Sequence, residues 1–236
     1  VNLTYLPFVL KAVSESLKEI PLLNSSWNED SIILKHQINL GIAVAAPDGL
    51  VVPVIENADA LSISGLAHKL DDLTTRAREG KLTVSDVQSG TFTVNNTGAL
   101  GSIASQPLVN YPQAGIITTE AIVKRPVVVN DAIAIRSIMN ICLSFDHRII
   151  DGAYGTKFLA RLKEILENSD VIRKIPRGGK FLWSNQFETA QDETGNFIEF
   201  RQLYYVSSDP EISGGMIQKP QANLGTAGTD VSGQWV

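Results

Sequence analysis

The stretch SFDHRIIDG at residues 144–152 decides the fold, because it links an apolar run to a helical pattern. Residues 138–145 form an apolar run that is typical of a buried strand. Residues 153–167 repeat apolar side chains at helical spacing, which predicts an amphipathic helix. Residues 146–152 therefore form the turn between a strand and a helix, a position where folds often present reactive side chains.

This turn contains a titratable pair with the spacing H-x-x-x-D-G. His147 is followed one helical turn later by Asp151 and then by Gly152, which permits tight backbone geometry. A neutral imidazole accepts a thiol or hydroxyl proton near neutral pH, as acyl transfer requires. On spacing alone, a surface turn closed by an ordinary ion pair is the more frequent explanation. The motif makes His147 a candidate general base, and the neighbouring sequence has to decide.

The rest of the first 170 residues alternates between helical and strand patterns, which predicts an α/β fold with a covered sheet. We expect one helix over residues 4–20, capped by Thr4 and ended by Pro21, and another over residues 64–79. Strands are predicted over residues 25–27, 31–36, 38–46, 50–55, 91–94, 114–119, 127–136 (interrupted at 130–131) and 138–145.

Two details of these strands matter later. The runs 38–46 and 50–55 are apolar throughout, so we expect both to be buried on both faces. The strand over residues 91–94 is followed by Asn95-Asn96-Thr97-Gly98, which we interpret as a polar turn.

The sequence resembles the dihydrolipoamide acyltransferases, the core subunits of 2-oxo acid dehydrogenase complexes, in four blocks that keep the family's order. These blocks are SFDHRIIDG, Gly41–Ile55, Gly90–Gly101, and Asn110–Gln113 followed by Lys124-Arg125-Pro126. The resemblance covers about residues 3–168. It implies a chloramphenicol-acetyltransferase-like CoA-dependent acyltransferase fold, with a mixed sheet covered by helices.

The resemblance also implies roles for three residues. His147 corresponds to the general base, and Asp151 to a structural anchor that the family holds with an arginine from an N-terminal stretch not found here. Asn95 occupies the position where the family usually has a serine or threonine that donates to the oxyanion. An amide NH₂ also donates, so Asn95 is the candidate, with Asn96 and Thr97 as substitutes if the register differs.

Cofactors and partners follow from the same resemblance. The family forms homotrimers with the active site between two subunits, where CoA enters from one side as a substrate and the lipoyl arm from the other. The trimers assemble into a larger core that binds the 2-oxo acid decarboxylase and dihydrolipoamide dehydrogenase subunits. The lipoyl group would be carried on an upstream or separate domain, and no metal is implied.

The same blocks indicate a class of substrate and bear on two alternative functions. Asn-Asn-Thr-Gly in the third block, with Asn-Tyr-Pro-Gln and Lys-Arg-Pro in the fourth, is most like bacterial branched-chain members, which suggests a branched acyl group such as isobutyryl. One alternative is a chloramphenicol-type antibiotic acetyltransferase, although those proteins typically have His-His where this chain has Asp146-His147. The other alternative is a non-catalytic assembly scaffold.

Composition narrows the class of protein. The 236 residues carry a net charge of −5, which gives no reason to expect nucleic acid as a partner. No apolar run is long enough to predict a membrane span, and the single cysteine, Cys142, fits a reducing compartment such as the cytoplasm. We interpret Cys142 as a buried free thiol, and His36 and His68 as structural or solvated side chains. The chain begins with Val1, so we expect it to be N-terminally truncated.

The last quarter of the chain differs in texture. We place a boundary near residue 170, with the acyltransferase catalytic domain over 1–170 and a tail of unknown function over 171–236. Strand-like pieces such as 197–206 alternate there with Gly-rich polar stretches. About residues 178–235 faintly resemble the extracytoplasmic part of a SecD-type export subunit. A chimeric extension and a lineage-specific extension are both open.

Overall fold

The computed structural model describes residues 4–47, 49–129, 131–167, 179–191 and 197–207. The chain divides into two compact units, which are described separately. One unit comprises residues 1–121 and 139–171, and the other comprises residues 122–138 and 172–236.

The first unit is built on a five-stranded mixed sheet, as predicted. Its spatial order is β11 (Ile141–Phe145), β8 (Gly115–Thr119), β7 (Phe92–Asn96), β3 (Leu40–Ile42) and β6 (Val54–Ile55). The three central strands β8, β7 and β3 run parallel, whereas β11 and β6 are antiparallel to their neighbours.

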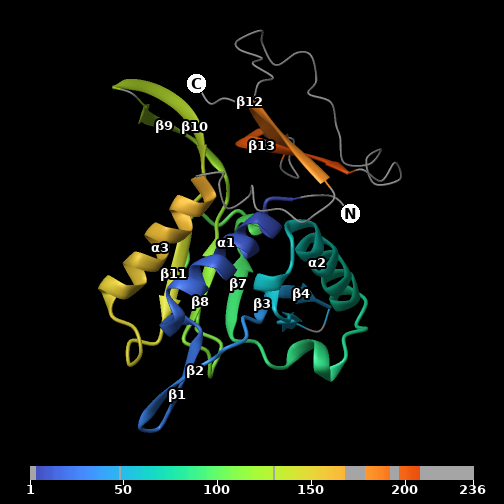
Figure 1. The fold of residues 1–236 in the computed structure, drawn as a ribbon, viewed down its shortest axis with the longest axis vertical. Coiled ribbons are helices and arrows are strands. Elements are labelled where there is room, and N and C mark those ends of the chain that lie inside the picture. Colours follow the sequence, from blue (N-terminus) through green and yellow to red (C-terminus); the bar gives the residue numbers. More distant parts are fainter. Residues whose placement is uncertain (1–3, 48, 130, 168–178, 192–196, 208–236) are drawn as a thin grey trace. The chain divides into compact units, whose positions relative to one another are not determined.

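Helices α1 (Leu6–Glu19) and α3 (Gly152–Glu167) lie together across the sheet (Figure 1). The Phe158 ring of α3 lies 5.7 Å from the Phe92 ring of β7, which identifies the face of the sheet that the helices cover. α1 buries an apolar stripe against the sheet, since Val9, Leu10, Val13 and Leu17 are at most 2% exposed.

The predicted cap of α1 is wrong. The helix begins at Leu6 with Tyr5 at the N-cap position, one residue beyond the predicted Thr4. Tyr5 occupies this position because its hydroxyl donates to Asn96 Oδ1 at 2.9 Å, which ties the start of the helix to the end of β7. Pro7 then supplies the helical φ of the first turn.

Helix α2 (Ile63–Arg78) agrees with the predicted range within one residue at each end. Ser62 caps it by accepting a hydrogen bond from Gly65 N at 3.0 Å, and its apolar stripe of Leu66, Leu70 and Leu73 is buried. Gly80 follows with a φ of +66°, the left-handed conformation expected after a helix end. Four short 3-10 turns complete the helical elements of the unit: η1 (Pro21–Leu23), η2 (Ala58–Ala60), η3 (Val84–Val87) and η4 (Gly98–Leu100).

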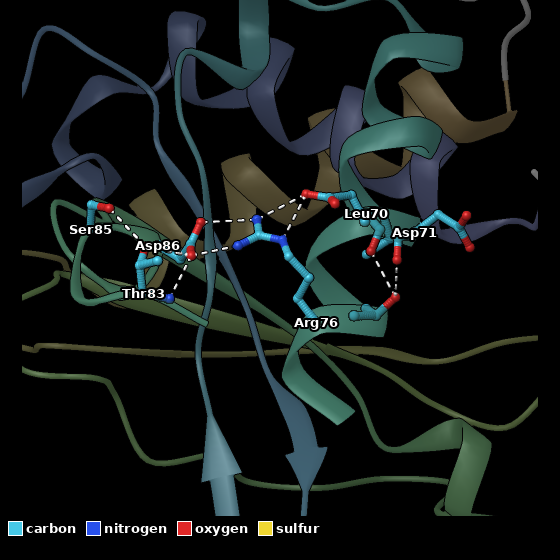
Figure 2. A network of polar contacts seen from close by, with 8 residues as sticks. Leu70, Asp71, Arg76, Thr83, Ser85 and Asp86 are labelled. Atoms are coloured by element: carbon cyan, nitrogen blue, oxygen red, sulfur yellow. Dashed lines mark hydrogen bonds and ion pairs between the residues drawn. The ribbon is translucent and has the colours of Figure 1, made fainter. Parts of the chain in front are cut away.

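A network of ion pairs joins the end of α2 to η3 (Figure 2). The guanidinium of Arg76 donates to both oxygens of Asp86, at 2.6 and 3.0 Å, and also to Asp72. Asp86 accepts two further bonds from Thr83, one from its backbone N at 2.7 Å and one from its hydroxyl. Arg76 first, and then Thr83, hold the pKa of Asp86 well below its ordinary value. This network fixes the chain that leads from α2 toward β7.

The apolar runs 38–46 and 50–55 each break into two strands, and the expectation of burial throughout is wrong. β4 (Val44–Ala46) and β5 (Gly49–Val51) leave the main sheet as a separate antiparallel pair, and Leu50 is 70% exposed. Pro53 lies at the break, where it has no N–H for the ladder, and its carbonyl accepts Ile42 N at 2.8 Å. The predicted strands over 25–27 and 31–36 are present as β1 (Ser25–Asn28) and β2 (Ser31–Leu34), which pair as an antiparallel hairpin.

The described part of the second unit forms two antiparallel strand pairs. β9 (Val123–Val129) pairs with β10 (Ala132–Ile138) in an antiparallel register with Val129 opposite Ala132, so the predicted strand over 127–136 belongs to two paired strands. β12 (Gly179–Gln191) pairs with β13 (Phe197–Ser207), and β13 agrees with the predicted strand over 197–206. The proposed boundary near residue 170, and residues 208–236, lie outside the described residues, so the division into domains stays a prediction.

Candidate active site

His147 lies in the turn between β11 and α3, as predicted. Its side chain is exposed, and its ring centroid lies 5.5 Å from that of Phe145, the last residue of β11. Phe145 in turn packs against Gly155 of α3, where an added Cβ would come within 2.8 Å of the Phe145 ring. The imidazole is thus supported on one side by an aromatic ring and open to solvent on the other.

Asp146 and Arg148 brace this turn from both sides of His147. The Asp146 carbonyl accepts Ile149 N and Ile150 N, both at 3.0 Å. The Asp146 carboxylate accepts Arg148 Nε at 2.9 Å and a second guanidinium N at 2.6 Å, and these bonds lower the pKa of Asp146. The Arg148 guanidinium also lies over the ring of Trp27, 5.4 Å from its centroid. The backbone at His147 is therefore held by its neighbours rather than by the imidazole.

Asp151 caps helix α3. Its Oδ1 accepts Tyr154 N at 2.7 Å, and its carbonyl accepts Gly155 N at 3.0 Å. Within the described ranges no arginine bonds the Asp151 carboxylate, so the arginine partner implied by the resemblance is not seen. The contacts give Asp151 the role of an anchor for the start of the helix that follows His147.

Asn95 lies within a strand, so its interpretation as the first residue of a turn is wrong. β7 continues to Asn96 because β8 offers it a parallel partner, with Asn95 opposite Thr118 and Asn96 opposite Thr119. The Asn95 carbonyl accepts the Thr119 hydroxyl at 3.4 Å, but its side-chain amide has no hydrogen-bond partner in the part of the chain that the structure describes. This partly buried amide is available as a donor.

The two substitutes for Asn95 are already engaged. Asn96 Oδ1 accepts the Tyr5 hydroxyl at 2.9 Å and Ala99 N at 3.3 Å. The Thr97 hydroxyl donates to Glu120 Oε2 at 2.9 Å. Asn96 is held through its oxygen and Thr97 through its hydroxyl, so Asn95 is the one of the three candidates whose side chain has no hydrogen-bond partner among the described residues.

Sheet topology does not bring Asn95 and His147 together within one chain. β11 is antiparallel to β8, so the His147 turn begins beside Ala114, whereas Asn95 is level with Thr118 at the other end of β8. Four residues along a strand separate these levels by roughly 13 Å, and β8 lies between the two strands. Because side chains alternate along a strand, Asn95 also points away from the helix-covered face that holds Phe92.

A buried carboxylate beside Asn95 was missed by the sequence prediction. Glu120 directly follows β8, is 0% exposed, and accepts hydroxyl bonds from Ser105 at 2.6 Å, Thr118 at 2.7 Å and Thr97 at 2.9 Å. Burial by itself raises the pKa of Glu120, but the bonds from Ser105, Ser102, Thr118 and Thr97 outweigh it and hold the pKa at about 2. Its one signal in the sequence is a charged residue directly after an apolar strand.

The remaining chemical candidates lie apart from these residues. His36 and His68 are exposed, and the free Cys142 is partly rather than fully buried, since it lies on the edge strand β11. Across the described ranges there is no group of three or more His, Cys, Asp or Glu side chains that could hold a metal. The described helices include none that is both long and apolar enough to cross a membrane.

Residues 1–173 match the family described as 2-oxoacid dehydrogenases acyltransferase (catalytic domain), and the chain belongs to this family. One relative is the lipoamide acyltransferase component of the branched-chain alpha-keto acid dehydrogenase complex of Bacillus subtilis. It is 54% identical over 170 residues, which cover 72% of this chain and 40% of that protein. The chain thus spans about two fifths of the length of this curated relative.

Solved structures agree on the fold. The probable dihydrolipoamide acetyltransferase of Listeria monocytogenes has a TM-score of 0.68 at 49% identity, over 74% of this chain and 73% of that one. The dihydrolipoamide acetyltransferase of Azotobacter vinelandii has a TM-score of 0.70 at 36% identity, over 73% and 72%. The expected acyltransferase fold, a mixed sheet covered by helices, is confirmed.

The Azotobacter vinelandii structure belongs to an investigation of a serine, a histidine and an asparagine in that enzyme's catalytic mechanism. Its serine lies 52 residues before the histidine, and its asparagine lies four residues after it. Asn95, His147 and Asp151 have the same two spacings in this chain.

Proposed function

We propose that the complete protein transfers an acyl group between dihydrolipoamide and coenzyme A, as a core subunit of a 2-oxo acid dehydrogenase complex. Family membership and the Bacillus subtilis relative support this activity. The observation that carries it is the strand-to-helix turn that presents His147 to solvent, with Asp151 capping the helix behind it.

His147 is the general base in this proposal. Its imidazole takes the proton of the CoA thiol, and the thiolate attacks the carbonyl carbon of S-acyl-dihydrolipoamide. The resulting oxyanion accepts a hydrogen bond from the Asn95 amide. The intermediate then expels the dihydrolipoyl sulfur, which receives the proton from His147, and acyl-CoA is formed. No oxidant or reductant takes part.

A second copy of the chain completes the site. His147 and Asn95 lie at opposite ends of β8, so one chain does not present both to one carbonyl. A cyclic homotrimer, as the family resemblance implies, would place Asn95 of one protomer beside His147 of its partner.

Branched acyl groups such as isobutyryl are the proposed substrates. The relative from Bacillus subtilis, a component of a branched-chain alpha-keto acid dehydrogenase complex, supports this choice over acetyl or succinyl groups. The lipoyl group would reach the site on an upstream or separate domain, and no metal is required by the mechanism. The proposed partners are the 2-oxo acid decarboxylase and dihydrolipoamide dehydrogenase subunits of the complex. The proposed location is the cytoplasm.

Steady-state kinetics of the complete purified protein tests this function. We expect acyl-CoA consumption to depend on added dihydrolipoamide, with isobutyryl-CoA preferred to acetyl-CoA and succinyl-CoA. Dependence on chloramphenicol instead would favour an antibiotic acetyltransferase, which family membership disfavours. If a correctly assembled protein consumes no acyl-CoA with either acceptor, the result would favour a non-catalytic assembly scaffold.

A further inference from the structure

The position of the Asn95 amide is set by the backbone around it, because the amide has no hydrogen-bond partner in the described residues. Two pieces of backbone define that position. One is β8, where Thr118 lies opposite Asn95, and the other is the segment that begins at Thr97, two residues after Asn95. Both Thr118 and Thr97 donate their hydroxyls to Glu120.

We infer that Glu120 is the positioning residue of Asn95: its buried carboxylate binds Thr118 and Thr97 together and so fixes the strand end that carries the oxyanion donor. This inference rests on the proposed function, because it takes Asn95 as that donor. It assigns Glu120 no contact with substrate.

The contacts around Glu120 join three segments of the chain. Besides Thr97 and Thr118, Ser105 donates to the carboxylate at 2.6 Å, and its hydroxyl also lies 2.9 Å from that of Thr118. Ala121 N donates to the Ser102 carbonyl at 2.6 Å, which holds the segment that contains Ser102 and Ser105 against the end of β8. A carboxylate suits this junction because it accepts several short, charge-assisted bonds at once.

Gly98 shows how closely the strand end is packed on this group. A Cβ at Gly98 would clash with the backbone of Glu120 and Ala121. The backbone that follows Asn95 is therefore held against Glu120 by two contacts, the hydrogen bond from Thr97 and the close approach of Gly98. A small shift of Glu120 moves this backbone as well.

A neutral pair would be sufficient if the role were only to fill the space. The same face of the sheet contains such a pair, where the Thr93 hydroxyl donates to the Gln113 side-chain oxygen at 2.6 Å. Glu120, by contrast, buries a charge that no cationic side chain of the described residues bonds, and an unpaired buried charge is costly. The Glu120 carboxylate lies at the junction next to Asn95. There its strong hydrogen bonds improve the placement of the Asn95 amide as an oxyanion donor.

Kinetics and melting curves of the complete protein test this inference. We expect Glu120→Gln to lower kcat about 10- to 100-fold, the scale of a misplaced catalytic group, while the KM for CoA stays within about twofold. Thr118→Val should lower kcat by a smaller factor, and Thr118→Ser, which retains a hydroxyl, should recover it. Asp86→Asn is the matched control, since it removes the charge of another carboxylate that accepts several hydrogen bonds, here from Arg76 and Thr83. It should lower the melting temperature and leave kcat unchanged.

A double-mutant cycle separates positioning from an independent effect. In an Asn95→Ala background, whose own kcat we expect to be about 10²- to 10³-fold lower, Glu120→Gln should change kcat by less than about twofold. Losses that multiply would overturn the inference, as would an unchanged kcat for Glu120→Gln beside an impaired Asn95→Ala. An unchanged kcat for Asn95→Ala would remove the oxyanion role of Asn95 and the inference with it, although His147 would still be the base. If Glu120→Gln does not fold, Thr118→Val decides by the same criteria.

Discussion

Asp86 and Glu120 are two well-bonded carboxylates of the same unit, and they are stabilised in different ways. Asp86 has a cation beside it, Arg76, and both side chains reach solvent, with relative exposures of 17% and 29%. Glu120 is fully buried and is bonded by hydroxyls. An ion pair near the surface holds two segments together with a small desolvation cost. A buried carboxylate bonded by hydroxyls has a larger desolvation cost, and it fixes the orientation of the groups that donate to it. The difference indicates that the first network serves the fold and the second serves the site.

The largest effect is expected outside both networks, at His147. His147→Ala in the complete protein should lower kcat by about 10²- to 10⁴-fold, because the general base is lost. The melting temperature and the oligomeric state should change little, since the turn is braced by Asp146 and Arg148. Near-normal turnover in this variant would contradict the mechanism.

Gly98→Ala probes the packing of the Glu120 network. The added methyl group clashes with the backbone of Glu120, so we expect the free energy of unfolding to fall by about 1–3 kcal/mol, as in overpacked cores. Gly80→Ala is a control at the end of α2, where an added Cβ meets nothing within 4 Å but φ is +66°. Urea unfolding compares the two. A smaller loss at Gly98 than at Gly80 would show that the strand end adapts to Glu120 more freely than the contacts indicate.

Acid should weaken both networks, while salt should weaken only one. The pKa of Glu120 is held at about 2 and that of Asp86 is also lowered, so each stabilises the folded state above its unfolded pKa near 4. As pH falls from about 5 toward 2, the unfolded state binds more protons and the free energy of unfolding decreases. Glu120→Gln should remove its share of this pH dependence. At neutral pH, 1 M salt should reduce the stabilisation by the partly exposed Arg76–Asp86 pair and leave that by Glu120 unchanged. Equal salt sensitivity of Asp86→Asn and Glu120→Gln would contradict the comparison.

The smallest effect is expected from the tail. Deleting residues 171–236 should leave the melting temperature within a few degrees and kcat unchanged, since the family match ends at residue 173. Thermal unfolding of the shortened and complete chains measures this. A large loss of stability would move the predicted boundary near residue 170.

Local patterns predicted the elements of the fold well, because periodicity reports burial directly. The turn at His147, helices α1 and α2, and strands β1 and β2 all follow from the spacing of apolar and turn residues. The errors arose where another segment decided the local structure. β7 extends through Asn95 because β8 pairs with it, and the runs around Pro53 divide because one part pairs elsewhere.

The candidate site residues came from two sources in the sequence. The turn motif gave His147 and Asp151, and the family resemblance added Asn95 and an active site between two subunits. The placement of His147 and Asn95 at opposite ends of β8 depends on strand order, which no local pattern contains. Glu120 was missed for the same reason. Its partners Thr97, Ser105 and Thr118 are scattered through the sequence and meet only in the folded chain.

Complementation between two inactive variants tests the central claim most directly. His147→Ala and Asn95→Ala should each be nearly inactive alone, at equal and near-normal melting temperatures. If each site takes His147 from one protomer and Asn95 from its partner, randomly mixed oligomers should regain about a quarter of wild-type activity. In an equal mixture, a site has an intact His147 with a chance of about one half and, independently, an intact Asn95 with a chance of about one half. Mixed oligomers that remain as inactive as the separate variants would contradict the shared site.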